Sequence, residues 1–585
     1  MSNRITNIIA ILLLVFVFLI TVFSMSGDNV TMDESSHLPA GYSYVSQKDM
    51  RINPEHPPLV KDLAGIPLLF IKGINFPYEI KAWQTDVNGQ WDFGFNFLYS
   101  RGNPVDKMIF WGRIPMILIL ILLGFYIFKW TRELYGNNAS LLALSLFSLS
   151  PTFLAHGRLV TTDVAAAVGA FIATYYFVKA LKTSNTKNIV FSGIWFGIAE
   201  LLKFSVILLV PLFIVLAIIW WLFVSKNFWQ ILKLLVSVFV IGFVVIGIVY
   251  MFHTWNYPPE KQVSDTAFIL TSFKYSAVSD AIVWMADKPI LRAYAQYLLG
   301  LAMVIQRATG GNTTYFMGEV SASGWKNYFP TVYFIKETLT LHILTFIALF
   351  YALYTGIKQI RKPIFSGIFR AIGNFVKYRF AELSMLGFMA IYWTTSLTSN
   401  LNIGARHLLP AFPFTIALVA GVVSATFFKQ PYMKLKQFII ITLIAWQAVS
   451  VLSVYPSFLT YFNEAVGGPT KGHLYSVDSN LDWGQDLKRL TKWVNDNKID
   501  LIYLDYFGGG DARYYLKEKF TPWHGDWSED NLPENSYLAI SATLLQGGRG
   551  KPVPGFNQNN GYYLWLNKYD PVTVIGNSIF VYRID

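Results

Sequence analysis

The chain of 585 residues is rich in apolar side chains, which make up 54% of it, and poor in charged ones, which make up 14%. This composition is typical of a membrane protein with many spans and excludes an ordinary water-soluble enzyme. The absence of cysteine excludes disulfides, thiolate metal sites and a cysteine nucleophile. The formal net charge of +12 fits basic loops beside a lipid bilayer, so no nucleic-acid partner is expected.

Apolar runs long enough to cross a membrane recur along the chain. The first extends from Ile5 to Ser24, follows Arg4 and can cross about 30 Å of hydrocarbon. We interpret it as a retained anchor, because it is longer than a usual signal segment and no small-residue cleavage site follows. The sequence predicts an α-helical polytopic membrane protein with about 11 to 13 transmembrane helices. Further candidate spans begin near Met108, Ala139, Asp163, Ile189, Phe204, Ile231, Thr331, Ala381, His407 and Phe438.

Basic residues in the loops predict the orientation of these spans. With the N-terminus in the cytoplasm, the alternate loops on that side hold Lys129, Arg132, Lys182, Lys187 and Lys226, as the positive-inside rule requires. We therefore expect a multi-pass protein of the plasma membrane with its N-terminus inside. The loops 27–107 and 253–330 and the C-terminal tail then lie outside the cytoplasm.

The tail from about residue 456 to 585 differs in character from the membrane part, residues 1–455. It is more polar, and clusters of Gly, Pro and Asn separate its periodic runs. A helix is predicted over Gln485–Asn495, and strands over Leu501–Phe507, Tyr537–Ile540 and Val572–Tyr582. We expect a small extracytoplasmic α/β domain.

Polar residues gather in the stretch 31–59, directly after the first span. Thr31 and Glu34 have the spacing of a capping box, which would give Glu34 a purely structural role. Titratable groups at the edge of a membrane are costly unless they are used. We therefore interpret the stretch as a candidate site of chemistry. Its candidate residues are Asp33, Glu34, Arg51, Glu55 and His56.

Three later clusters fall on the same predicted side of the membrane or reach it, and each has a structural alternative. In the turn 156–163, Asp163 could simply cap the next helix. Lys203 follows Glu200 by three residues and could pair with it. Arg406 in the segment 402–407 could extend toward the interface, or bind a phosphate through its guanidinium fork. The candidate residues of these clusters are Arg158, Asp163, Lys203, Arg406 and His407.

The motifs together resemble a known family. They are the acidic pair after the first span, NPEHPPL (53–59), HGRLVTTD (156–163), LLKFS (201–205) and GARHLLPAFPF (404–414). In this order they are similar to the polyprenyl-phosphate-dependent glycosyltransferases of the GT-C class, in particular to the protein O-mannosyltransferase and aminoarabinose transferase branch. YFNEAVGG (461–468) and DSNLDWGQDL (478–487) resemble a tail motif of uncharacterised bacterial members. The resemblance spans nearly the whole chain.

The resemblance implies roles for the acidic residues. The first-loop carboxylate of the family acts as, or beside, the catalytic base, which points to Asp33 with Glu34 as its neighbour. The acidic residue of the second turn is carried over to Asp163. The Glu before the paired prolines lines the site and in some relatives helps to hold a divalent ion, which points to Glu55.

The resemblance also implies positions that bind the donor. The basic residue after the paired leucines, a phosphate contact in relatives, falls on Lys203. At His56 this chain departs from relatives, which often have a lysine there. We assign to substrate binding the residues Arg51, Glu55, His56, Arg158, Lys203, Arg406 and His407.

The expected reaction moves a hexose, mannose-like sugar or pentose from a polyprenyl phosphate to an acceptor outside the cytoplasm. A carboxylate would take the acceptor proton, and cationic side chains would stabilise the leaving phosphate. The family implies a single displacement with inversion. The acceptor is a protein, a lipid or a glycan of the cell envelope. Glu55 and a histidine such as His253 could hold a divalent metal ion, and the sequence spacing does not decide this.

Two other classes of protein remain open at the level of sequence. A transporter or flippase of a lipid-linked or anionic substrate would also carry charges within the membrane, although no inverted repeat stands out and the polar clusters gather at one surface. A scaffold or sensor would use its tail to bind a partner, and Asp33 would then be dispensable.

Overall fold

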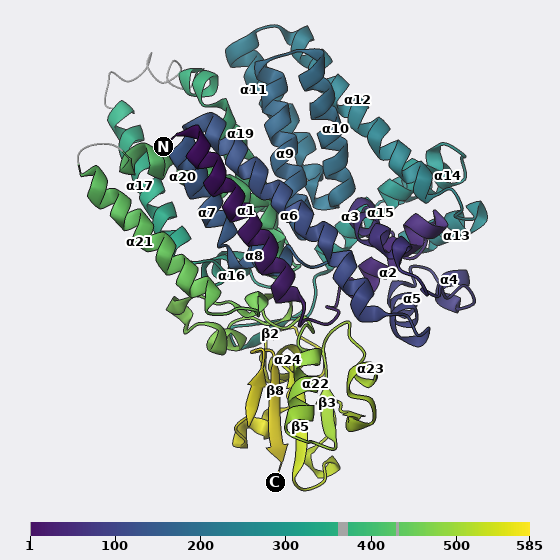
Figure 1. Cartoon of the computed structure of the whole chain (residues 1–585). Helices are drawn as coiled ribbons and strands as arrows, with labels where there is room; N and C mark the ends of the chain where they lie inside the picture. The colour runs from purple at the N-terminus through teal and green to yellow at the C-terminus, as the bar shows by residue number, and fades with distance from the viewer. Residues whose placement is uncertain (1, 361–372, 429–431, 585) are drawn as a thin grey trace.

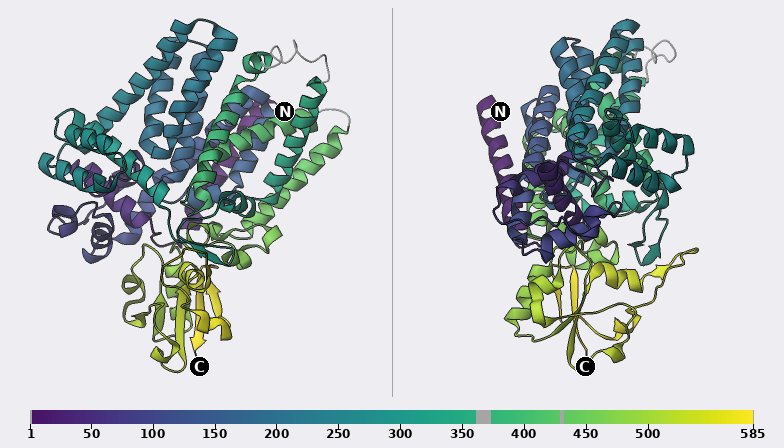
Figure 2. Two further views of the ribbon diagram at one scale, coloured as in Figure 1. Left: turned by 180° about the vertical axis from the view of Figure 1, so that it is seen from behind. Right: turned by 90° about the vertical axis from the view of Figure 1, so that its right-hand side faces the viewer.

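The computed structural model describes the chain except for residues 1, 361–372, 429–431 and 585. Figure 1 shows a large helical body above a smaller region that contains a β-sheet and the C-terminus. The N-terminus lies toward the opposite end of the body. The two further views in Figure 2 show the same division.

Seven helical segments within the described residues are long and apolar enough to cross a membrane. An eighth span results if α16 (Tyr328–Lys336) and α17 (Leu339–Ile360), which meet at a bend of 114°, are counted as one. The most deeply buried is α9, with 89% of its apolar window inside the protein, so α9 forms the centre of the body. The seven segments are α1 (Asn3–Met25), α6 (Val105–Tyr135), α9 (Asp163–Lys182), η3–α11–η4 (Phe204–Ser225), α12 (Phe228–His253), η6–α20 (Ala405–Phe427) and α21 (Met433–Leu452).

Helices also occupy the three other predicted positions, but they do not meet the same criteria of length and apolarity. These are α7 (Asn137–Ser148), α10 (Thr186–Leu202) and α19 (Phe380–Thr398). The helix α7 is shorter than a span because Pro151 starts a separate short helix, α8 (Pro151–His156). The helix α10 ends where Lys203 takes an extended backbone. The described residues thus contain seven or eight clear spans, fewer than the 11 to 13 expected.

Further helices, most of them short, lie along the right-hand side of the body in Figure 1, toward its lower end. The pair α2 and α3 packs with close backbone contact, because a Cβ on Gly41 would lie 2.0 Å from the carbonyl oxygen of Lys61. This contact fixes the segment after α1 against the body. The helices of this layer are α2 (Glu34–Gln47), α3 (Leu59–Gly65), α4 (Lys81–Gln84), α5 (Gln90–Phe95), α13 (Pro259–Ile269), α14 (Ser276–Ala286) and α15 (Leu291–Gly310).

The C-terminal region contains a five-stranded sheet in the order β4-β3-β5-β8-β7. The strand β3 (Ile502–Asp505) is parallel to β4 (Phe520–Pro522) and to β5 (Ser536–Ser541). The strand β8 (Ile579–Ile584) is antiparallel to β5 and to β7 (Thr573–Ile575). Three helices accompany the sheet, namely α22 (Leu487–Asp496), α23 (Ala512–Leu516) and α24 (Ala542–Arg549).

The predicted helix and strands of the tail are confirmed, with one difference. The run 572–582 forms two strands rather than one, because Gly576 and Asn577 adopt positive φ and turn the chain between β7 and β8. The expected fold class, an α-helical polytopic membrane protein with a small C-terminal α/β region, is confirmed.

Contacts between the C-terminal region and the helical body include two sets of backbone hydrogen bonds. The backbone N–H groups of Asn29 and Met32, just after α1, donate to the carbonyls of Gln485 (3.2 Å) and Trp483 (3.1 Å). A small second sheet pairs β2 (Glu319–Ser321) with both β1 (Thr314–Phe316) and β6 (Lys551–Pro552). The tail therefore closes over the start of the first outer loop.

Candidate active site

A buried arginine brings three of the predicted clusters together. Arg406 lies at the start of η6 (Ala405–Ala411), and its Nη1 donates to Oδ2 of Asp33 at 2.8 Å and to Oδ2 of Asp163 at 3.1 Å. Asp33 precedes α2 and Asp163 begins α9. Arg406 is 6% exposed, so its side chain is enclosed by the protein and does not extend into the surroundings. Its pairing with two carboxylates is the centre of the site.

Lys203 extends this centre through Asp163. Its Nζ donates to Oδ1 of Asp163 at 2.5 Å. The alternative pairing of Lys203 with Glu200 is wrong, because Glu200 accepts instead from the hydroxyl of Tyr297 at 2.9 Å. The reason is the end of α10: Glu200 still belongs to its last turn, whereas Lys203 has left the helix with φ −163° and ψ 135°. Asp163 itself stands in the first turn of α9 and does not cap it.

The carboxylates at the centre differ in access. The side chain of Asp33 is 24% exposed and that of Asp163 is 1% exposed. Both oxygens of Asp163 are occupied, by Lys203 and by Arg406. Oδ1 of Asp33 makes no hydrogen bond within the described part of the chain. Asp33 is therefore the carboxylate of this pair that a substrate can reach.

The C-terminal tail contributes side chains to this centre that the sequence did not place there. Oγ of Ser479 accepts from Nε of Arg406 at 3.1 Å. The indole ring of Trp483 lies 4.1 Å from the guanidinium carbon of Arg406, a cation–π contact. Both residues belong to the motif 478–487, whose similarity to relatives was the one sequence signal for them.

Asp478 is a third carboxylate beside Arg406. Burial raises the pKa of its carboxyl to about 6, although Arg406 acts in the opposite direction. Its Oδ1 accepts from the backbone N–H of Ser479 at 2.5 Å. Its own N–H donates to the hydroxyl of Thr543 at 3.0 Å, which ties it to α24.

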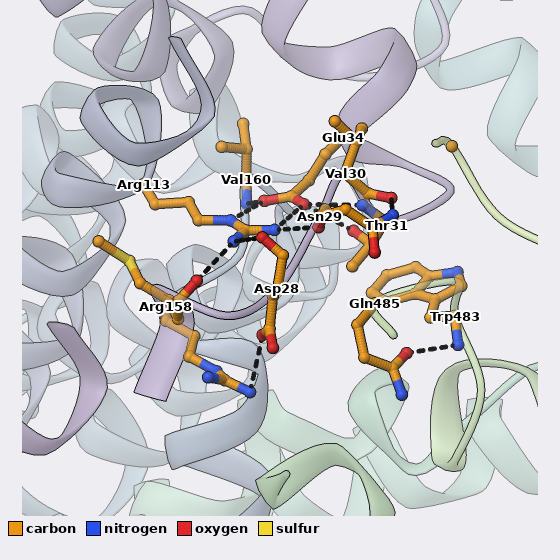
Figure 3. A network of polar contacts seen from close by, with 12 residues as sticks. Asp28, Asn29, Val30, Thr31, Glu34, Arg113, Arg158, Val160, Trp483 and Gln485 are labelled. Carbon is orange, nitrogen blue, oxygen red and sulfur yellow. Dashed lines mark hydrogen bonds and ion pairs between the residues drawn. The ribbon is translucent and has the colours of Figure 1, made fainter. Parts of the chain in front are cut away.

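Glu34 has a different environment from its neighbour Asp33, and Figure 3 shows the contacts of Glu34. Its carboxylate accepts from Nε and Nη2 of Arg113 at 2.8 and 2.6 Å and from the N–H of Val160 at 3.0 Å. It also accepts from the N–H and the hydroxyl of Thr31 at 3.0 and 2.9 Å. Burial opposes ionisation, but Arg113 and these hydrogen bonds hold the pKa of Glu34 below its usual value.

The capping box expected at Thr31 is therefore only half present. Glu34 reaches back to the N–H of Thr31, but the helix begins at Glu34, with Asp33 at its N-cap and no capping bond from the Asp33 side chain. Glu34 is completely buried, and its partner Arg113 lies in the third turn of α6, where no role was predicted from the sequence. This pair fixes the segment that carries Asp33.

Arg158 does not join the Arg406 centre. Its Nη2 lies 3.0 Å from Oδ2 of Asp28, which also pairs with Arg489 of α22 at 2.7 Å. Figure 3 shows the Arg158 side chain pointing toward Asp28 and away from the Glu34–Arg113 pair. The structure thus places Arg158 among contacts between the body and the tail.

The remaining predicted residues have partners of their own or none at the centre. Arg51 pairs with Asp49 and stacks on Trp83, so it belongs to the outer loop. Glu55 pairs with Arg307, at the end of α15. Nε2 of His407, the residue after Arg406, is buried without a hydrogen-bond partner among the described residues.

His56 packs edge-on against His37, with ring centroids 5.3 Å apart. Burial, with smaller contributions from His37 and nearby lysines, lowers the pKa of His56 well below its ordinary value. An uncharged imidazole is a weaker partner for a phosphate than the lysine that relatives often have there.

Glu55 and His253 do not come together as metal ligands. Glu55 is bonded to Arg307, and Nε2 of His253 lies 2.8 Å from Oδ1 of Asp62. In the part of the chain that the structure describes, no group of three or more His, Cys, Asp or Glu side chains is arranged to hold a metal ion.

Comparison with known families supplies an independent observation. Residues 105–253 match the sequence model of the family described as dolichyl-phosphate-mannose-protein mannosyltransferase. The resemblance expected from the motifs is confirmed. The mannosyltransferase-like segment contains Asp163 and Lys203, whereas Asp33, Arg406 and Trp483 lie outside it. No curated protein matches the chain in sequence.

Several solved structures are similar to the chain in overall architecture. ArnT from Cupriavidus metallidurans, bound to undecaprenyl phosphate, is 11% identical, with a TM-score of 0.44 over 98% of this chain and 97% of that one. The archaeal oligosaccharyltransferase AglB from Archaeoglobus fulgidus, in complex with an inhibitory peptide and a dolichol-phosphate, is 13% identical, with a TM-score of 0.47 over 93% and 71%. The S. cerevisiae protein O-mannosyltransferase complex Pmt1-Pmt2, bound to the sugar donor, is 17% identical, with a TM-score of 0.33 over 44% and 34%.

Proposed function

We propose that this chain is an integral-membrane glycosyltransferase that moves a sugar from a polyprenyl-phosphate donor to an acceptor. The observation that carries the proposal is the centre formed by Asp33, Arg406, Asp163 and Lys203, in which an accessible carboxylate stands beside two cationic side chains. The family match over residues 105–253, which include Asp163 and Lys203, supports the same activity.

The two cationic side chains retain donors for a phosphate. Nζ of Lys203 has three N–H groups and gives one to Asp163. Arg406 uses Nη1 and Nε, and its Nη2 makes no hydrogen bond to the described residues. In the reaction the bond between the anomeric carbon and the phosphate oxygen breaks, and its electron pair leaves with the phosphate. Lys203 and Arg406 would stabilise this growing negative charge.

Asp33 is suited to be the general base. The oxygen of the acceptor hydroxyl, or the nitrogen of an acceptor amine, attacks the anomeric carbon, and its proton passes to Oδ1 of Asp33. The bond from Arg406 to Oδ2 orients the carboxylate and keeps its other oxygen available. Glu34 has no such oxygen free, so we assign it a positioning role through Arg113.

We infer a single displacement with inversion, and the geometry supports this choice. Asp33 and Asp163 bind the same nitrogen at 2.8 and 3.1 Å. Their Oδ2 atoms therefore lie within about 6 Å of each other, near the spacing found in double-displacement enzymes. However, both oxygens of Asp163 are engaged and its side chain is 1% exposed. Asp163 is thus unavailable as a nucleophile, and its role is to hold Lys203 and Arg406.

The site is proposed to face the outside of the plasma membrane. Asp163 begins α9 and Lys182 ends it, so the site and this basic loop lie at opposite ends of a helix about 30 Å long. Since basic loops favour the cytoplasm, the centre and the tail from about residue 456 would lie on the outer side. A protein, lipid or glycan acceptor of the cell envelope would reach Asp33 from there.

The test uses purified protein in lipid nanodiscs, with synthetic polyprenyl-phosphate hexose or pentose donors. We expect sugar transfer by the wild type and its loss in Asp33→Asn, with retention in Asp92→Asn, an exposed carboxylate of the same outer loop. The anomer of the product reports inversion, and a chelator added to the wild type reports any need for a divalent metal. Full activity of Asp33→Asn would refute the assignment of the base.

The same experiment separates the transferase from a transporter or flippase. A transporter would move the lipid-linked or anionic substrate across the bilayer without breaking the sugar–phosphate bond. Absence of bond cleavage with every donor, in folded and monodisperse protein, combined with movement of a labelled donor between leaflets, would favour transport.

A further inference from the structure

A helical hairpin beside the last turn of α12 has an unusually apolar outer surface. The hairpin consists of residues 255–290 and contains α13 and α14. Its large side chains are open to the surroundings, with exposed fractions of 74% for Trp255, 69% for Phe268, 59% for Trp284 and 68% for Ile290. In Figures 1 and 2 the hairpin projects sideways from the body, away from the C-terminal sheet.

The exposed side chains are distinct from those that pack the hairpin against the body. A separate set of residues serves that contact, because Leu270, Ile282 and Ala286 are buried against Ala295 and Leu299 of α15. The hairpin therefore has two apolar surfaces, one covered by α15 and one uncovered. A helix that is apolar on more than one face is typically enclosed by protein or by lipid. α14 has 11 residues and is too short to cross a bilayer.

The uncovered surface continues the outward face of a membrane span. In the last two turns of α12, Ile248, Met251 and Phe252 are 62%, 40% and 41% exposed. Trp255 follows directly. Since α12 is one of the seven spans, its exposed side chains contact lipid, and the exposed Trp255 extends this apolar face to the start of the hairpin.

The polar groups of the hairpin fit the headgroup level of a bilayer. Lys274 lies 5.9 Å from the ring of Tyr275, and Lys288 lies 5.8 Å from the ring of Trp284. Such basic and aromatic neighbours are typical of membrane interfaces, where the ring lies among the lipids and the ammonium group reaches water. The hairpin contains three lysines and four carboxylates, so attraction to anionic lipid would not drive this contact.

We propose that residues 255–290 form a lipid-docking surface that lies in the interfacial layer of the bilayer, held by apolar contact. The next helix of the chain, α15, is mostly covered instead. Its residues Ala293, Ala295 and Leu299 are covered by the protein, because α15 packs between α12 and α14. The docking surface is thus formed by the helices that cover α15.

The absence of cysteine in the chain allows a direct test. Trp284→Cys is labelled with an environment-sensitive fluorophore, and the full-length protein is reconstituted in nanodiscs that contain lipids with nitroxide groups at the headgroup or in the acyl chain. Val572→Cys is the matched control, since Val572 is also well exposed, at 53%, but lies just before β7 in the C-terminal region. We expect a blue-shifted emission and at least about a twofold quenching at position 284, and neither change at position 572.

Two further measurements separate apolar lipid contact from a change of fold, from charge attraction and from protein association. Ile290→Cys repeats the labelling in case the loss of Trp284 alters the fold. Nanodiscs of zwitterionic lipid alone and of zwitterionic lipid mixed with anionic lipid should give equal quenching, because the contact is apolar. Water-like emission without quenching at both 284 and 290 would overturn the proposal. Quenching that requires anionic lipid would overturn the apolar mechanism, and a blue shift that depends on protein concentration without quenching would identify a second copy of the chain as the occupant.

Discussion

Neutralising the adjacent carboxylates Asp33 and Glu34 is predicted to affect stability and activity in different ways. Glu34→Gln leaves the guanidinium of Arg113 buried without its counter-charge, since the side chains of the pair are 0% and 1% exposed. Removing one partner of such a pair costs about 3–5 kcal/mol of unfolding free energy. Asp33→Asn weakens one of the two ion pairs of Arg406, and the pair with Asp163 remains. The side chain of Asp33 is 24% exposed. The stability cost of Asp33→Asn is about 1 kcal/mol or less.

The activities should follow the opposite order. Loss of a general base typically lowers the rate by about 10²- to 10⁴-fold, so Asp33→Asn should be folded and nearly inactive. Glu34→Gln should lose transfer roughly in proportion to the fraction of protein that unfolds. The assay combines reversible unfolding in mixed micelles, followed by tryptophan fluorescence, with single-turnover sugar transfer.

A double variant provides the control for the buried pair. Glu34→Leu combined with Arg113→Leu removes both charges, so it should recover part of the stability that either single variant loses. A Glu34→Gln protein that unfolds like the wild type but transfers no sugar would refute the positioning role and place Glu34 in the chemistry. An Asp33→Asn protein as unstable as Glu34→Gln would refute the distinction between the two residues.

Two further predictions test the centre and the tail residue Asp478 beside it. Arg406→Lys should lower kcat/KM for transfer by about 100-fold, because an ammonium group cannot reach Asp33, Asp163 and Ser479 together in the way the guanidinium does. Steady-state kinetics measure this, and a value within about threefold of the wild type would contradict it. Asp478→Asn should raise the unfolding temperature at pH 7.5 and change it little near pH 4. Burial raises the pKa of Asp478 to about 6 in the folded chain, so the wild type loses stability as the pH rises from the unfolded value of about 3.9 through 6, and the amide avoids this loss. Thermal unfolding of both proteins at the two pH values checks it, and an equal difference at both would be evidence against the assigned titration.

The sequence predicted the members of the centre better than their pairing. Asp33, Asp163, Lys203 and Arg406 were each identified because charges beside apolar runs are costly unless they are used. Their contacts depend on the residue at which each helix ends. Glu200 and Lys203 are three residues apart and would meet on a regular helix, but α10 stops between them, and no composition signal marks that stop.

The contacts of residues inside long apolar segments or in the tail could not be predicted in this way. Arg113 lies inside α6, and its partners, Glu34 and backbone carbonyls of residues 25–29, come from a segment far away in the sequence. Trp483 looked like one aromatic residue among many, and its position over Arg406 results from the packing of the whole tail on the body. Arg158 was predicted beside the donor because of its neighbours in the sequence, yet its side chain turns to Asp28.

The order in which the centre's residues appear along the chain bears on biosynthesis. Asp33 leaves the ribosome early, Arg406 follows 373 residues later, and Ser479 and Trp483 come later still. At about 5–20 residues per second, the interval from the first to the last is on the order of tens of seconds. During this time the nascent chain is a membrane protein whose centre lacks the contacts of Ser479 and Trp483 with Arg406. Truncation before residue 478 would leave most of the spans in place and remove these contacts, so the centre is complete only once the tail has been made.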